Sequence, residues 1–183
     1  MRRALPVALA AAALALAACA ESPVLEPGVE GSAARAVGAA PSRAASPSRP
    51  AGGTCTLLSV TVLPPLPGQP ANVVRRQNEW VCQLQHLGRT TATSTETGTA
   101  MASGSAVTGT AVFTAANGDQ LLTAFSGIAT FPDANGIVTF NGTDTVTGGT
   151  GRFAGASGSF TRTTRVSVIL RTGQFELDGT LSY

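Results

Sequence analysis

From Thr54 onward, hydrophobic and polar residues alternate in short runs, and this period of two is that of a β-strand. The clearest run is 174–181, in which Phe175, Leu177 and Leu181 share one face and Gln, Glu and Asp side chains share the other. No stretch in this part of the chain shows the spacing of an amphipathic helix. The pattern predicts an all-β domain.

The strands are predicted to follow one another as a meander. Asn-Gly pairs at 117–118 and 135–136 indicate tight turns, because Asn and Gly tolerate the positive φ that such turns need. The same order of Gly, Ala, Phe, Ala, Asn and Gly starts at Gly109 and again 18 residues later at Gly127. Seven to nine strands fit into 54–183. A closed up-and-down antiparallel barrel of about eight strands would leave no sticky edge.

The stretch 148–158, GGTGRFAGASG, raises the question of a phosphate-binding loop. Residues 149–154 fit the G-x-G-x-x-A pattern of dinucleotide-binding folds, which place the glycines between a strand and a helix. Here a Thr/Val/Ser-rich run typical of a strand follows, and the chain contains no Lys for a P-loop. The glycines therefore indicate a sharp bend in a sheet.

This stretch, the ending GQFELDGTLSY and the segments TAANGDQL and FNGTDTVTGGTGRF resemble the allene oxide cyclase-like barrels, which include the plant dirigent proteins. The resemblance covers roughly 105–183. It implies a calycin-like, eight-stranded antiparallel barrel with a central apolar cavity, plugged at one end by Phe153. Plant members form trimers, so it also allows a homo-oligomer. It transfers no catalytic or binding residue, because the shared motif is structural.

The first twenty residues, MRRALPVALAAAALALAACA, have the parts of an export signal. Arg2 and Arg3 precede an apolar stretch too short to span a bilayer comfortably. The sequence Leu-Ala-Ala-Cys resembles a bacterial lipobox, which predicts a signal peptide over 1–18 and a lipid on Cys19. The alternative is an ordinary signal with an incidental Cys. The lipoprotein prediction places the chain in the cell envelope, at the outer membrane if the host has two membranes.

Residues 19–53 are rich in Ala, Pro, Ser and Gly and almost lack large apolar side chains. Such a segment buries too little surface to offset the entropy of ordering it. It is predicted to be a disordered linker between Cys19 and the barrel domain, 54–183.

The three cysteines are Cys19, Cys55 and Cys82. If Cys19 carries a lipid, the other two are left to form a disulfide, which the oxidising space outside the cytoplasm permits. The alternative is two free buried thiols. The composition argues against a zinc site, because the only other soft ligand is His86 and zinc needs four ligands. No metal and no cofactor is predicted.

The formal charge of +2 loses its two positive charges when Arg2 and Arg3 are removed with the signal. A neutral chain without clustered cations argues against binding to nucleic acid.

Candidate ligand-binding residues are few. His86 is an even number of residues from Cys82 and Leu84, so in a continuous strand it would share their face and point into the barrel. The simpler alternative is an exposed or hydrogen-bonded side chain. Arg75 and Arg76 precede a strand and form either a rim that meets an anionic ligand or a solvated turn.

The remaining charged side chains point to structural roles. Asp119 and Asp133 lie beside predicted turns and are expected to shape them. Arg152 is expected to point outward. No catalytic residue is identified.

The sequence supports three functions, none of which it singles out. The first is a lipid-anchored barrel that binds a small apolar ligand or a surface partner without catalysis. The second is an isomerase or cyclase that steers a reactive substrate in its cavity, which rests on the resemblance alone. The third is a structural module of the envelope without a ligand.

Overall fold

The structure is a computed structural model that describes residues 46–183, and the predictions on Cys19 and on 1–18 lie outside these residues. The described chain forms eight strands and one short 3-10 helix: β1 Arg49–Leu63, β2 Val73–Leu84, β3 Gly88–Met101, β4 Gly104–Ala115, β5 Gln120–Ala129, β6 Ile137–Gly149, η1 Gly151–Phe153, β7 Ser157–Ser167 and β8 Thr172–Ser182. A helix long and apolar enough to cross a membrane does not occur between residues 46 and 183.

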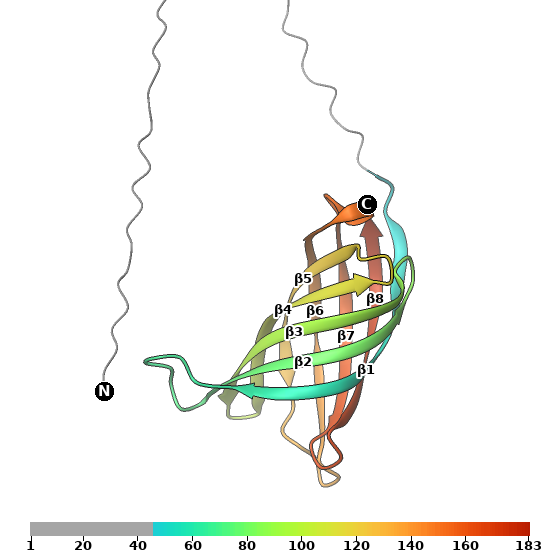
Figure 1. The fold of residues 1–183 in the computed structure, drawn as a ribbon. Coiled ribbons are helices and arrows are strands. Elements are labelled where there is room, and N and C mark those ends of the chain that lie inside the picture. The colour runs from blue at the N-terminus through green and yellow to red at the C-terminus, as the bar shows by residue number, and fades with distance from the viewer. Residues whose placement is uncertain (1–45) are drawn as a thin grey trace, which may run out of the picture. The chain divides into compact units, whose positions relative to one another are not determined.

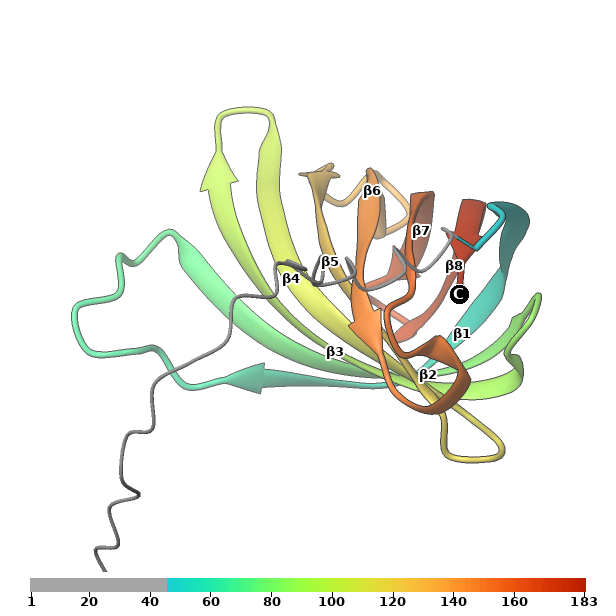
Figure 2. The same ribbon diagram turned by 90° about the horizontal axis from the view of Figure 1, so that it is seen from above.

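The strands form one closed barrel in the order β1 to β8, and each strand pairs antiparallel with its neighbours (Figure 1). Figure 2 shows β2, β3 and β4 sweeping around one side, with β6, β7 and β8 standing opposite. The predicted fold class, a closed antiparallel up-and-down barrel, is confirmed.

The up-and-down order gives the barrel two different ends. The connections 85–87, 116–119 and 150–156 and the C-terminal Tyr183 lie at one end, called here the closed end. The connections 64–72, 102–103, 130–136 and 168–171 lie at the opposite end, called here the mouth.

Both Asn-Gly turns are present. Gly118 has φ 88° and Gly136 has φ 72°, in the left-handed region that only glycine adopts freely. Asp133 Oδ1 accepts hydrogen bonds from the backbone N–H groups of Asn135 and Ile137, so it shapes its turn as predicted.

Two sequence-based details are corrected. β1 begins at Arg49, so the barrel starts five residues before Thr54, inside the predicted linker. Gly52 and Gly53 let β1 lie close to both neighbours there, because a Cβ on either residue would meet backbone atoms at 2.4 Å or less. The 18-residue echo also breaks down at Phe131, which is 51% exposed in the loop after β5, whereas its counterpart Phe113 is fully buried.

Cys55 and Cys82 are joined in a disulfide, which confirms the predicted pair. They face each other on β1 and β2, and both side chains point into the barrel. The bond thus ties the first two strands together in the core.

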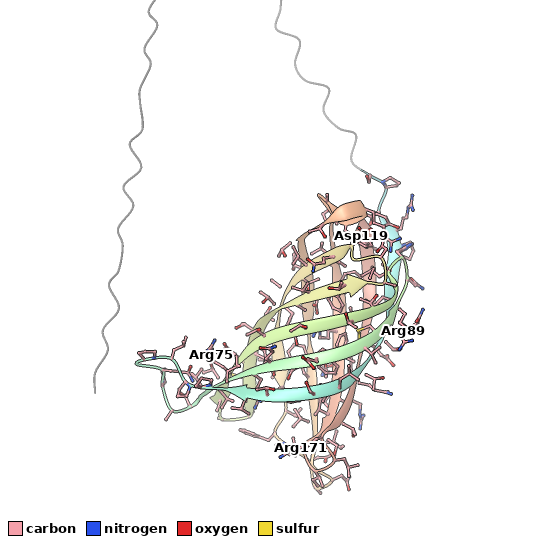
Figure 3. The ribbon with its side chains drawn as sticks, in the orientation of Figure 1. Arg75, Arg89, Asp119 and Arg171 are labelled. Carbon is pink, nitrogen blue, oxygen red and sulfur yellow. A yellow bond between two sulfur atoms is a disulfide. The ribbon has the colours of Figure 1, made fainter. Side chains whose placement is uncertain are left out.

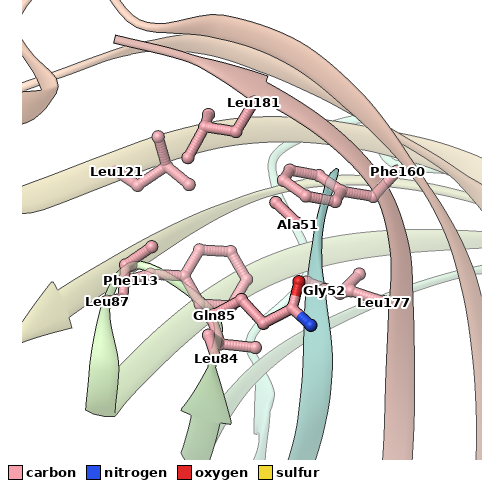
Figure 4. A pocket seen from close by; sticks show the side chains of 10 residues that line it. All are labelled: Ala51, Gly52, Leu84, Gln85, Leu87, Phe113, Leu121, Phe160, Leu177 and Leu181. Carbon is pink, nitrogen blue, oxygen red and sulfur yellow. The ribbon is translucent and has the colours of Figure 1, made fainter. Parts of the chain in front are cut away.

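The closed end is filled by side chains. Ala51, Leu84, Phe113, Leu121, Phe160 and Leu181 converge there around a void of only about 10 Å³, the space of about one water molecule (Figure 4). The chain turns at the glycine-rich stretch between β6 and β7, and η1 places Phe153 under this layer with no exposed surface. The glycines therefore form a corner, and Phe153 plugs the end as predicted.

Candidate functional site

The other half of the barrel interior is hollow and opens at the mouth. The cavity has a volume of about 810 Å³, which is in the range of pockets that hold small molecules. Its wall combines aliphatic, aromatic and polar side chains, among them Val60, Trp80, Val107, Phe140 and Arg162.

Three inward-facing glycines make room for the aromatic part of this wall. A Cβ on Gly127 or Gly142 would lie 2.8 Å or 2.4 Å from the ring of Phe140. A Cβ on Gly109 would lie 2.5 Å from the ring of Phe125. The two rings therefore lie across bare backbone and pack edge to face with centroids 6.2 Å apart. Because both rings lie against the wall, the centre of the cavity stays open.

A buried ion pair forms part of the cavity floor. Arg162 on β7 donates two hydrogen bonds to Asp144 on β6, from Nε to Oδ2 at 2.7 Å and from Nη2 to Oδ1 at 2.6 Å. Thr123 on β5 donates a third hydrogen bond to Oδ1 at 2.9 Å. Asp144 has no exposed surface and Arg162 is 4% exposed. Both charges are thus removed from water and compensated by each other.

The Arg162 guanidinium lies between two aromatic rings. Its Cζ is 4.4 Å from the ring centroid of Phe125 and 4.4 Å from that of Phe175. Both contacts are within the range of cation–π attraction, which is stronger where water is excluded. The rings fix the plane of the guanidinium as well as its position.

The third guanidinium nitrogen, Arg162 Nη1, has no hydrogen-bond partner in the described structure. No fully buried side-chain nitrogen or oxygen atom among residues 46–183 lacks a partner, so Nη1 is not sealed off. Arg162 lines the cavity, and Nη1 is the guanidinium nitrogen left without a partner for a group bound there.

A second polar group lies on the wall formed by β2 and β3. Ser94 Oγ accepts hydrogen bonds from Asn78 Nδ2 at 3.3 Å and from Trp80 Nε1 at 3.2 Å. Nearer the mouth, Arg76 and Glu96 form an ion pair at 3.5 Å. The cavity is therefore polar on two sides. Arg162 and Arg76 each have a partner of opposite charge, whereas Arg171, exposed at the mouth, lines the cavity and forms no ion pair within residues 46–183.

The two arginines predicted to form a rim, Arg75 and Arg76, point in different directions in the structure. Arg76 lines the cavity, while Arg75 is directed away from it and donates to Pro64 O at 3.3 Å. Figure 3 shows Arg75 and Arg171 near the mouth and Arg89 and Asp119 near the closed end. Both Arg75 and Arg76 lie within β2, not before a strand.

His86 lies in the turn between β2 and β3 at the closed end, with φ 67°, so the interior position suggested by parity is wrong. Alternation ends where the strand ends, at Leu84. The His86 ring hydrogen-bonds to Pro50 O at 2.9 Å and packs against Tyr183. The simpler reading of a hydrogen-bonded His describes it.

Arg152 is largely exposed, as expected, 3.5 Å from Asp119. Its guanidinium also covers the ring of Phe153, with Cζ 4.8 Å from the ring centroid. Both contacts are at the closed end, remote from the cavity.

Sequence reasoning missed Asp144 and Arg162. The available signal was the period of two along each strand. Asp144 lies an even number of residues from Phe140 and Val146, and Arg162 lies two residues from Phe160, so each charged residue shares a face with core residues. Charged residues in line with core residues on neighbouring strands indicate an internal pair. In the described part of the chain, no group of three His, Cys, Asp or Glu side chains is arranged to hold a metal ion.

Comparison with known proteins finds a likeness in structure and none in sequence. No family model matches the chain, and no curated protein matches it. Among solved structures, a pterocarpan synthase dirigent protein is similar, with a TM-score of 0.46 and 12% sequence identity over 78% of this chain and 88% of that chain. A likeness of this degree carries no argument about activity. The allene oxide cyclase part of the resemblance stays a prediction.

Proposed function

We propose that the barrel binds one small, largely apolar molecule in the cavity at its mouth. The observation that supports this most is the contrast between the two halves of the interior. The closed end is packed down to a void of about 10 Å³, while the mouth half keeps about 810 Å³ open. Protein interiors pack tightly by default, so a large cavity lined by ordered aromatic rings is typical of a binding site.

The polar groups restrict the ligand further. Arg162 and Asp144 neutralise each other, as do Arg76 and Glu96, so the one charged lining residue without an ion pair in the described chain is Arg171, exposed at the mouth. Below the mouth, a charged ligand group would have to give up its hydration without gaining an unpaired partner of opposite charge. Arg162 Nη1 does offer a fixed hydrogen-bond donor. We therefore propose a neutral ligand that places a carbonyl, ether or hydroxyl oxygen at the cavity floor.

The hydrogen bond to Arg162 is tested by varying the ligand, because replacing Arg162 would leave Asp144 unpaired. A ketone and the hydrocarbon of the same shape are titrated into the chain lacking residues 1–19, which keeps every described strand. The ketone is expected to bind about ten-fold or more tightly, since a hydrogen bond from a charged donor contributes about 1.5–3 kcal/mol. Equal affinity, or tighter binding of the matching carboxylate, would contradict the proposed ligand class.

The second candidate, a substrate-steering isomerase or cyclase, uses the same cavity. The observation that favours it is the Arg162 donor, fixed between two rings, which can stabilise negative charge that develops on a substrate oxygen. Turnover of an unsaturated epoxide by the parent chain, absent after the cavity is filled, would support this second function over simple binding.

We also propose that the chain is exported and anchored to a membrane by a lipid on Cys19. The support is the sequence alone, namely the basic start, the apolar stretch and the small residues before Cys19. Expression of the full chain with an alkyne-labelled fatty acid is expected to label it, and the label is expected to disappear in Cys19→Ser. Labelling that persists in this variant would argue against the assignment.

A further inference from the structure

β1 extends past its neighbour β8 toward the mouth. β8 pairs with β1 only as far as Thr56, opposite Gln174, whereas β1 continues to Leu63. A register shift between Leu57 and Ser59 bends β1 at this point. Figure 1 shows β1 leaving β8 and running to the β1–β2 loop as the outer strand of its sheet.

The segment 58–62 is therefore a strand edge, called here the β1 edge. Within residues 46–183, β2 is the only segment that pairs with it. On its other side the backbone N–H and C=O groups of the β1 edge have no strand partner. A closed barrel normally removes such edges, but the seam that closes this barrel, between β1 and β8, covers only residues 49–56 of β1.

The side chains of the β1 edge are unusual for an exposed strand. Leu58, Val60 and Val62 are 61%, 44% and 67% exposed. The segment has no charged residue and no Pro, although edges that remain free in solution are commonly protected by charges, Pro or short length. Pro64 and Pro65 follow directly after β1 and prevent its extension.

The chemistry of the β1 edge selects a strand as its partner. A lipid surface would cover the three aliphatic side chains, but hydrocarbon offers nothing to the unpaired N–H and C=O groups. Water satisfies those groups and leaves the side chains exposed. An added strand satisfies the backbone and covers the side chains together.

The sequence of the β1 edge, LSVTV, is complementary to itself. In an antiparallel pair centred on Val60, Leu58 of one copy faces Val62 of the other, and Ser59 faces Thr61. Apolar residues then meet apolar residues on one face, and hydroxyl residues meet on the other. Two-fold pairing brings identical surfaces together, and it meets no like-charge repulsion here because the segment is uncharged.

We propose that two copies of this chain pair through their β1 edges, antiparallel and about a two-fold axis at Val60. The same edge forms one side of the cavity, since Leu58, Val60 and Val62 line it. In the dimer, the second copy's strand lies along the side that β8 leaves open and completes the cavity wall there. The pairing does not depend on which ligand the cavity holds.

The test is the mass in solution of the chain lacking residues 1–19, measured by sedimentation equilibrium over a range of concentrations. Without further substitution, this protein (the parent) is expected to have twice the mass of a single chain. Val62→Lys is expected to be monomeric, because it places an ammonium group opposite Leu58 of the second copy. The matched control is Ile128→Lys, which removes an equally apolar, 49% exposed residue from the outer wall of β5 and is expected to stay dimeric. Circular dichroism and melting temperature establish that each variant is folded.

The register is tested by oxidation of Val60→Cys. Facing Cα atoms in an antiparallel pair lie about 4.5–5.5 Å apart, which a disulfide can bridge. We expect a covalent dimer from Val60→Cys and none from Ile128→Cys. A parent that is monomeric at every concentration, or a dimer that survives Val62→Lys, would overturn the proposal. Flotation of a monomeric parent with phosphatidylglycerol vesicles, lost in Val62→Lys, would assign the β1 edge to a lipid surface instead.

Discussion

Replacing Asp144 by Leu is expected to lower the free energy of unfolding by about 3–5 kcal/mol, because it leaves the Arg162 cation buried without its counter-charge. Asp144 has no exposed surface and accepts three hydrogen bonds, two from Arg162 and one from Thr123. Urea unfolding, followed by the fluorescence of Trp80, measures the loss.

The control for this prediction is the double variant Asp144→Leu/Arg162→Met, which removes both charges and keeps side chains of similar size. It is expected to recover most of the lost stability, since an apolar pair needs no charge compensation. If the double variant is as unstable as Asp144→Leu, the loss comes from packing and not from the unpaired cation.

Replacing Phe153 by Ala is expected to cost about 3–5 kcal/mol, the usual range for removing a fully buried aromatic ring. Phe153 closes the barrel at the glycine corner and packs against Tyr183 with ring centroids 5.0 Å apart. The same urea unfolding measures the loss, with Arg152→Ala as the neighbouring control.

The Phe153→Ala substitution is expected to affect stability without affecting ligand binding. Phe153 lies at the closed end and does not line the cavity, so a folded Phe153→Ala chain is expected to keep the ligand affinity of the parent. A large change in affinity with little change in stability would place Phe153 in the binding site and contradict its role as a plug.

Much of the fold follows from local chemistry that is visible in the sequence. Positive φ at Gly118 and Gly136 produces turns that could be read from the Asn-Gly pairs. Alternation in 174–181 gave the inward residues of β8, because that strand is paired along its whole length without a bulge. The start of β1 at Arg49 was hidden, because Pro50 and two glycines carry no strand signal and are held by β8 and β2.

The site was harder to predict than the fold. An alternating polar residue normally faces water, and only the closed barrel turns the side of β6 that carries Asp144 into an interior. The pairing of Asp144 with Arg162 depends on the register between β6 and β7, which no local signal sets. The β1 edge likewise depends on where the pairing between β1 and β8 ends, and these two strands lie more than one hundred residues apart in the sequence.

The claim on which the proposed function depends is that the mouth half of the barrel is an open binding cavity, and titration with a neutral apolar fluorophore tests it most directly. The parent is expected to bind one fluorophore per barrel. Ala129→Trp, which fills the cavity from β5, is expected to lose binding, while Ile128→Trp, on the outer side of the same strand, is expected to keep it. No binding by the parent, or equal binding by all three chains, would contradict the account.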